Sequence, residues 1–142
     1  MAANLTDKKS LNLEVSKQIA AAAEKEAIAN KWTMVIVILD EGGNILFLER
    51  MDETQIGSVE VAIQKARSAI LFKRPTKVFE DAVVGGRNAI LSLPGAVPIE
   101  GGLPITVDGK IIGAIGVSGA TSAQDGQTAK AGLDALPKIL GK

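Results

Sequence analysis

Two stretches in the first half of the chain place apolar residues at helical spacing. The first predicts a helix that ends near Asn30, with Ser10 or Asn12 as its cap. The second predicts a helix from about Ser58 to Lys73, which Pro75 ends because proline cannot continue a helix. The apolar positions are Val15, Ile19, Ala22, Ala23 and Ala27 in the first helix, and Val59, Ala62, Ile63, Ala66 and Ile70 in the second.

Two further helices are predicted by weaker patterns. A short one runs from Thr76, which we expect to be its cap, through Val83. The last one starts near Ser122 or Asp125, with Pro137 as the expected kink. Its apolar positions are Ala129, Leu133, Leu136 and Leu140.

The remaining apolar segments predict two β-hairpins. The continuous β-branched run Thr33–Leu39 leads through the turn Asp40–Asn44 to a return strand, Ile45–Leu48. Leu103–Val107 and Ile111–Val117 flank the turn residues Asp108 and Gly109 in the same manner. Because the first strand is apolar on both faces, helices must cover both sides of the sheet. We therefore predict an α+β fold: a three-layer α/β/α sandwich around a mainly antiparallel sheet.

Composition narrows the chemistry further. The 142 residues include no His, no Cys and no Tyr, which excludes a Ser-His-Asp triad, a disulfide and a zinc–thiolate site, and we assign no metal site. The length suits a single domain, residues 1–142. Sixteen basic and sixteen acidic residues give a net charge of zero, which argues against nucleic acid as a partner and favours self-association.

No stretch of the sequence indicates a membrane or an export route. The longest apolar run, Met34–Leu39, is far shorter than a membrane span. The first residues lack a basic segment followed by an apolar one, so we expect no signal peptide and a cytoplasmic protein.

Candidate site residues occur first around the first hairpin. Asp40 ends a buried strand, where a carboxylate can be partly desolvated, although a turn alone explains Asp40 and its glycines. Arg50 and Asp52 are spaced to share one face of a strand. They can hold an organic acid or simply pair with neighbouring charges.

A second group follows on and after the second predicted helix. Lys65 lies among alanines at the edge of the apolar face, with Arg67 nearby. A solvated helix face explains both residues, but a lysine among small residues can also approach a ligand or a partner. Lys73 and Arg74 place two cations beside Thr76 at a helix start, a place that attracts anions. Helix capping alone explains Thr76 equally well.

A third group lies in the glycine-rich second half. Gly101 and Gly102 leave backbone amides free beside Glu100. Ser118 ends a glycine-containing strand in which Gly113 and Gly116 let a helix or a flat ligand come close. The start of the last helix, Thr121–Asp125, reads as a capping box.

These segments together resemble the GlcG/HbpS family of haem-binding proteins, the domain that also ends the PduO-type cobalamin adenosyltransferases. The resemblance covers about Leu11 to Leu136. The matching pieces are Val37–Asn44, Arg50–Asp52, Lys65–Ala66 with Ala69, Pro75–Thr76, Ile99–Ile105 and Ile112–Gly119.

The resemblance implies a profilin-like sandwich and a homo-oligomer built from dimers, up to an octamer. It also implies haem as a candidate cofactor, and Thr76 aligns with a threonine linked to haem in secreted members. This chain has no histidine to hold the iron, and it has Asp125–Gly126 where the family typically continues Asp-Glu.

Two hypotheses remain open. In the first, the chain binds haem or another flat organic anion and is accessory to a catabolic pathway. Its expected ligand-binding residues are Arg50, Arg67, Lys73, Arg74, Thr76, Gly101, Gly102 and Ser118. In the second, it is a cofactor-independent lyase, isomerase or hydrolase acting on a small organic acid. Its expected acid–base residues are Asp40, Asp52, Lys65 and Glu100.

Overall fold

A buried strand, β1 (Val35–Asp40), forms the centre of the sheet in the computed structural model, which describes all 142 residues. Its neighbours are β2 (Ile45–Arg50) on one side and β4 (Lys110–Ser118) on the other. β3 (Gly102–Val107) follows outside β4, so the order is β2-β1-β4-β3 and every pair is antiparallel. Both hairpins expected from the sequence are present.

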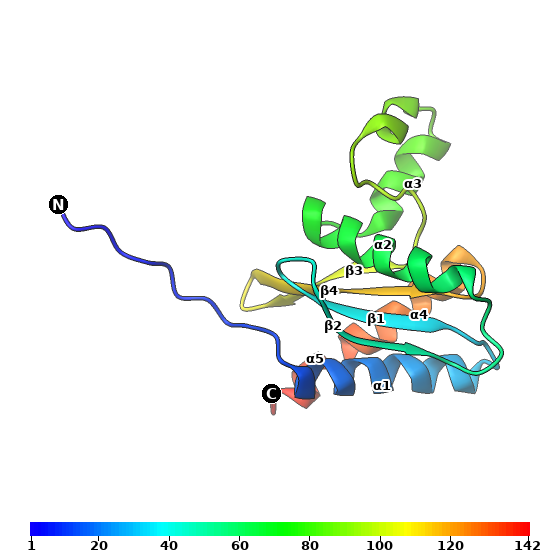
Figure 1. Cartoon of the computed structure of the whole chain (residues 1–142), viewed down its shortest axis with the longest axis horizontal. Helices are drawn as coiled ribbons and strands as arrows, with labels where there is room; N and C mark the ends of the chain where they lie inside the picture. The colour runs from blue at the N-terminus through cyan, green and yellow to red at the C-terminus, as the bar shows by residue number, and fades with distance from the viewer.

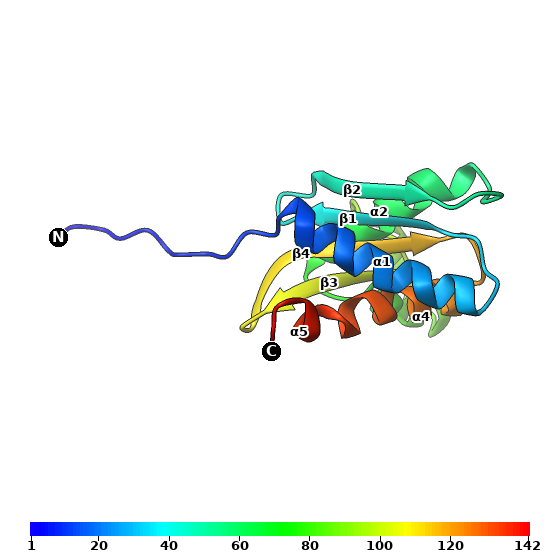
Figure 2. The ribbon, with the colours of Figure 1, turned by 90° about the horizontal axis from the view of Figure 1, so that it is seen from below.

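Helices cover the sheet on both faces, as Figures 1 and 2 show. One layer holds α1 (Leu13–Ala29), α4 (Ser122–Asp134) and the short α5 (Leu136–Ile139). The other holds α2 (Gly57–Phe72), beyond which α3 (Thr76–Val84) and the 3₁₀ turn η1 (Asn88–Ser92) project from the body. The predicted α+β architecture is therefore confirmed.

The two faces of β1 explain why helices lie on both sides. Ile36 and Ile38 join the larger core, which α1 and α4 cover. Val35, Val37 and Leu39 point the other way into the smaller core beneath α2. All five side chains are fully buried, and burial of each contributes about 1.5–3 kcal/mol. Moving this strand by one residue would exchange the two faces, so the pattern fixes its register.

Gly116 sets the closeness of α2 to the sheet. A Cβ at this position would collide with the Ala62 carbonyl oxygen and would lie 2.8 Å from the Ala66 Cβ. Glycine is required because the helix backbone packs directly on β4. Of the two alternatives for this glycine, a helix rather than a flat ligand uses the space.

Several local expectations are corrected or sharpened. Asn12 caps α1, because its Oδ1 accepts a hydrogen bond from the Val15 amide at 2.9 Å. Thr76 is not a cap: Pro75 occupies that position, and the Thr76 hydroxyl turns to the Gly102 amide instead. Pro137 does more than kink the last helix, since α4 ends at Asp134 and α5 begins separately.

Residues 1–10 form an arm that contains no helix or strand and extends away from the body in both views (Figures 1 and 2). None of the helices combines the length and the hydropathy that a bilayer crossing requires.

Candidate functional site

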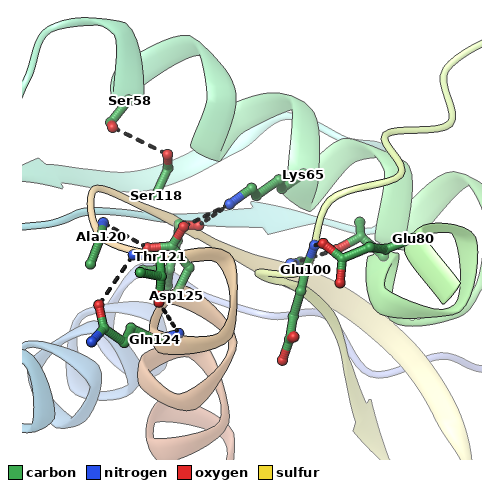
Figure 3. Close-up of polar contacts among 12 residues, drawn as sticks. Ser58, Lys65, Glu80, Glu100, Ser118, Ala120, Thr121, Gln124 and Asp125 are labelled. Carbon is green, nitrogen blue, oxygen red and sulfur yellow. Dashed lines mark hydrogen bonds and ion pairs between the residues drawn. The ribbon is translucent and has the colours of Figure 1, made fainter. Parts of the chain in front are cut away.

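Lys65 is the largest fully buried side chain of the protein. It lies on α2 and is 1% exposed. Its Nζ donates hydrogen bonds to Asp125 Oδ2 at 2.9 Å and to the Val117 carbonyl oxygen at 3.1 Å (Figure 3). A buried ammonium is tolerated only when it is paired in this way. The sequence alternative of a solvated helix face is therefore wrong for Lys65.

Asp125, the partner of Lys65, stands in the first turn of α4. Its Oδ1 accepts a hydrogen bond from the Ala120 amide at 3.0 Å. Burial raises the pKa of Asp125, and the Lys65 ammonium and the backbone amides act against that rise. Just before it, Thr121 and Gln124 form the predicted capping box, which orients the helix start.

Gly101 and Gly102 lie directly on Lys65. A Cβ at Gly101 would stand 2.8 Å from Lys65 Nζ and 2.6 Å from the Val117 carbonyl oxygen. A Cβ at Gly102 would collide with the Lys65 carbonyl oxygen. The two glycines therefore allow the loop before β3 to close over the ion pair and to exclude water from it.

The same loop is tied to α3 by two hydrogen bonds. The Gly102 amide donates to Thr76 Oγ1 at 3.0 Å, and Thr76 is fully buried. The Glu100 amide donates to Glu80 Oε1 at 3.3 Å (Figure 3). Movement of α3 would therefore also move the loop that covers Lys65.

The Glu100 side chain fills a space that Gly126 leaves open. A Cβ on Gly126 would collide with the Glu100 carboxylate, so the glycine found here is what admits it. Lys77 Nζ lies 3.7 Å from Glu100 Oε1 and 3.1 Å from Asp81 Oδ1. The hydrogen bond with Asp81, together with nearby carboxylates, raises the pKa of Lys77. We refer to the connected set as the Lys65 cluster: Lys65, Thr76, Glu80, Glu100, Gly101, Gly102 and Asp125.

The other predicted ligand residues surround this cluster or lie apart from it. Ser118 Oγ donates to Ser58 Oγ at 3.1 Å in the buried contact between β4 and α2. Arg67 donates to the Gly43 carbonyl oxygen at 3.3 Å, toward the other end of α2. Lys73 is exposed at the end of α2 in a left-handed conformation.

Arg74 is exposed at the junction of α2 and α3. Its guanidinium lies 5.7 Å from the centre of the Phe79 ring, and its Nε donates to the Phe72 carbonyl oxygen at 2.8 Å. These contacts orient the guanidinium by cation–π attraction and leave its other donors available.

The four expected acid–base residues do not converge. Asp40 Oδ1 accepts hydrogen bonds from the Gly42 and Asn44 amides, both at 2.9 Å, as in an ordinary turn. Arg50 and Asp52 are exposed at the opposite end of the β1–β2 hairpin. Of the four, Lys65 and Glu100 are brought together, on either side of the Asp125–Gly126 step.

Asp125 and Glu80 are site residues that sequence reasoning missed. Asp125 looked like part of a helix start, and only the crossing of α2 over β4 brings it to a lysine 60 residues away. Glu80 carried no sequence signal, since it is one charge on a short helix. None of the cavities in the structure is lined by a residue of the Lys65 cluster.

A family model and several known proteins match most of this chain. The model of the family described as haem-degrading protein HbpS-like matches residues 11–134. Protein GlcG of Escherichia coli K12 is 44% identical over 108 residues, covering 76% of this chain and 81% of GlcG.

Two solved structures are similar over almost the whole chain. The Klebsiella pneumoniae protein ORFY has a TM-score of 0.85 and 33% identity, covering 96% of this chain and 97% of its own. The haem complex of PduOC has a TM-score of 0.80 and 29% identity, covering 89% and 95%. The resemblance inferred from the sequence is confirmed, and the chain belongs to the HbpS-like family.

Proposed function

We propose that this protein binds haem or another flat organic anion as a homo-oligomer, and that it is accessory to a catabolic pathway. The family description names haem, and the PduOC relative is described in complex with it. The oligomer we propose is built from dimers, up to an octamer.

The observation that carries the proposal is the surface of the segment around α3 and η1. This segment projects from the body (Figure 1). It also exposes a set of apolar side chains. They are Val78, Val84, Leu91 and Leu93. Exposed cations, Arg74 and Arg87, belong to the same segment, and Lys73 immediately precedes it. Apolar surface flanked by cations suits a flat ligand that carries carboxylates.

The side chains of this segment can bind the propionates of a haem, but the chain offers no His, Cys or Tyr ligand for its iron. Arg74 makes no ion pair within the chain, so its free guanidinium donors can bind a propionate. Thr76 is buried and already accepts the Gly102 amide, so iron can approach its hydroxyl only if the loop moves. Because the chain has no His, Cys or Tyr, the macrocycle would be held by its propionates and its apolar face. Bound haem would supply redox-active iron.

No cavity of the single chain is lined by a residue of α3 or η1, so we place the site at the boundary with a second copy. The exposed apolar residues of α3 and η1 would then be covered jointly by the ligand and the partner. The net charge of zero supports this arrangement, because it leaves little electrostatic repulsion between copies.

Haemin titration followed in the visible spectrum tests the proposal. We expect a shifted Soret band, with affinity at least tenfold weaker in Arg74→Gln because one propionate partner is lost. Lys17→Gln, an exposed charge change on α1 in the opposite layer, is the matched control. Absence of any Soret shift would remove haem as the ligand.

A second comparison tests Thr76. Thr76→Ser keeps the hydroxyl and should bind haemin as the natural chain does, whereas Thr76→Ala should bind more weakly. Equal binding by all three proteins would remove Thr76 from the site.

A further inference from the structure

An apolar groove lies at the end of the molecule that holds the start of α1 and the C-terminus. It has a volume of about 370 Å³ and opens between the start of α1, the β3–β4 hairpin and α5. Its apolar lining is Leu11, Val15, Val107, Ile112, Leu136 and Leu140. Lys9 and Lys142 stand at its rim. We call it the arm groove.

A second cavity, of about 230 Å³, adjoins the arm groove. It shares the side chains of Val107, Leu136 and Leu140 with the groove and is also lined by Leu133 of α4 and Pro137 of α5. Two neighbouring hollows with apolar walls suit the successive side chains of a peptide segment better than a disc-like ligand.

The arm of residues 1–10 leaves the body at the start of α1 (Figure 2), and its residues Lys9 and Ser10 line the groove. Met1 and Leu5 are its large apolar side chains. Leu5 is 98% exposed, and Met1 is fully exposed. The six residues that precede Asp7 can span about 20 Å when fully extended, which is far enough to contact another molecule.

Contacts at the base direct the arm outward. Lys8 pairs with Glu41, and Lys9 Nζ lies 2.7 Å from Asp108 Oδ2. Lys110 Nζ donates to the Asp7 carbonyl oxygen at 3.4 Å. For Leu5 to enter the groove of its own chain, the backbone would have to reverse within residues 5–9 and break these contacts.

We propose that the segment Ala2–Leu5 of one copy docks in the arm groove of a second copy, with Leu5 against Leu136 and Leu140. We take the exchange to be reciprocal, which gives the pair the two-fold symmetry that is commonest among homodimers. Docking removes from water the exposed surface of Leu5 and the exposed parts of Val15 and Leu140, which favours association. This contact involves no residue of α3 or η1, although Lys73, beside the proposed ligand site, lines a separate cavity with the arm residues Thr6 and Lys8.

Because the chain contains no Cys, paired cysteines give an unambiguous test. The single variants Leu5→Cys and Leu140→Cys, with tags of different mass, are mixed in the full chain and oxidised with oxidised glutathione. Leu140 is 38% exposed, so neither change disturbs the core. The control pair is Leu5→Cys with Ile28→Cys, since Ile28 is 59% exposed but lies near the far end of α1.

We expect the Leu5–Leu140 pair to form the mixed disulfide at least tenfold faster than the control pair. Equal rates would overturn the proposal.

The Leu5→Cys/Leu140→Cys double variant provides a second test. It should form covalent dimers at micromolar concentration. A disulfide within each monomer, at a rate independent of concentration, would show that the arm folds onto its own groove and would also overturn the proposal.

Discussion

Lys65 Nζ and Asp125 Oδ2 are 2.9 Å apart, and both side chains are almost completely excluded from water. This pair joins α2 to α4 near the end of the interior strand β4 and lies beneath the Gly101–Gly102 loop. Removal of two charges from water is costly, so each charge depends on the other.

Asp125→Leu should destabilise the fold by about 3–5 kcal/mol, because it leaves the buried Lys65 ammonium without its carboxylate. The double variant Lys65→Met/Asp125→Leu should recover most of that loss, since an apolar pair of similar volume needs no counter-charge. Urea unfolding of the natural chain, both single variants and the double variant gives the coupling free energy. If the losses in unfolding free energy of the two single variants simply added in the double variant, the two charges would not depend on each other.

Gly102→Ala should cost at least about 1–3 kcal/mol, because the new methyl group collides with the Lys65 carbonyl oxygen. Gly57→Ala is the matched control, since a Cβ there meets no atom within 4 Å and Gly57 begins α2. The control should be neutral or slightly stabilising. Thermal unfolding compares the melting temperatures of the two variants. Equal melting temperatures would show that the Gly101–Gly102 loop can shift to accommodate the methyl group without loss of stability.

Thr76→Val should destabilise the chain by about 1–3 kcal/mol, because it leaves the buried Gly102 amide without an acceptor. Thr76→Ser keeps the oxygen and should lose much less. Hydrogen exchange at the Gly102 amide is the direct measurement, and it should accelerate in the valine variant alone. Unchanged protection in that variant would show that the hydrogen bond does not hold the loop.

Glu49 should make stability depend on pH. Burial, together with Glu24, raises the pKa of Glu49 above its ordinary value of 4.5, and its Oε1 is buried without a hydrogen-bond partner. The folded state therefore holds more protons than the unfolded state just above pH 4.5, so this residue lowers stability as pH rises through that window.

Glu49→Gln should accordingly be more stable than the natural chain at pH 7, and the difference should shrink toward pH 4. Glu53→Gln, at an exposed position without an ion pair, is the control. Denaturant titrations at several pH values test this. A Glu49→Gln variant that is less stable at pH 7 would reverse the predicted sign.

The sequence by itself determined the elements and their layers. The continuous apolar run in β1 required cover on both faces, and the helical spacing in α1 and α2 supplied it. These signals are local in the chain, because periodicity reports which face of an element is buried. The chain's family resemblance was also readable from short segments in order.

Only the tertiary structure decided the Lys65 cluster. Lys65 and Asp125 are 60 residues apart, and their pairing depends on the approach of α2 to β4 that Gly116 permits. Thr76 likewise satisfied the sequence rule for a cap, but the loop before β3 brings the Gly102 amide within reach of its hydroxyl. A side chain's partner is set by which backbone segments meet in space, and no local pattern encodes that meeting.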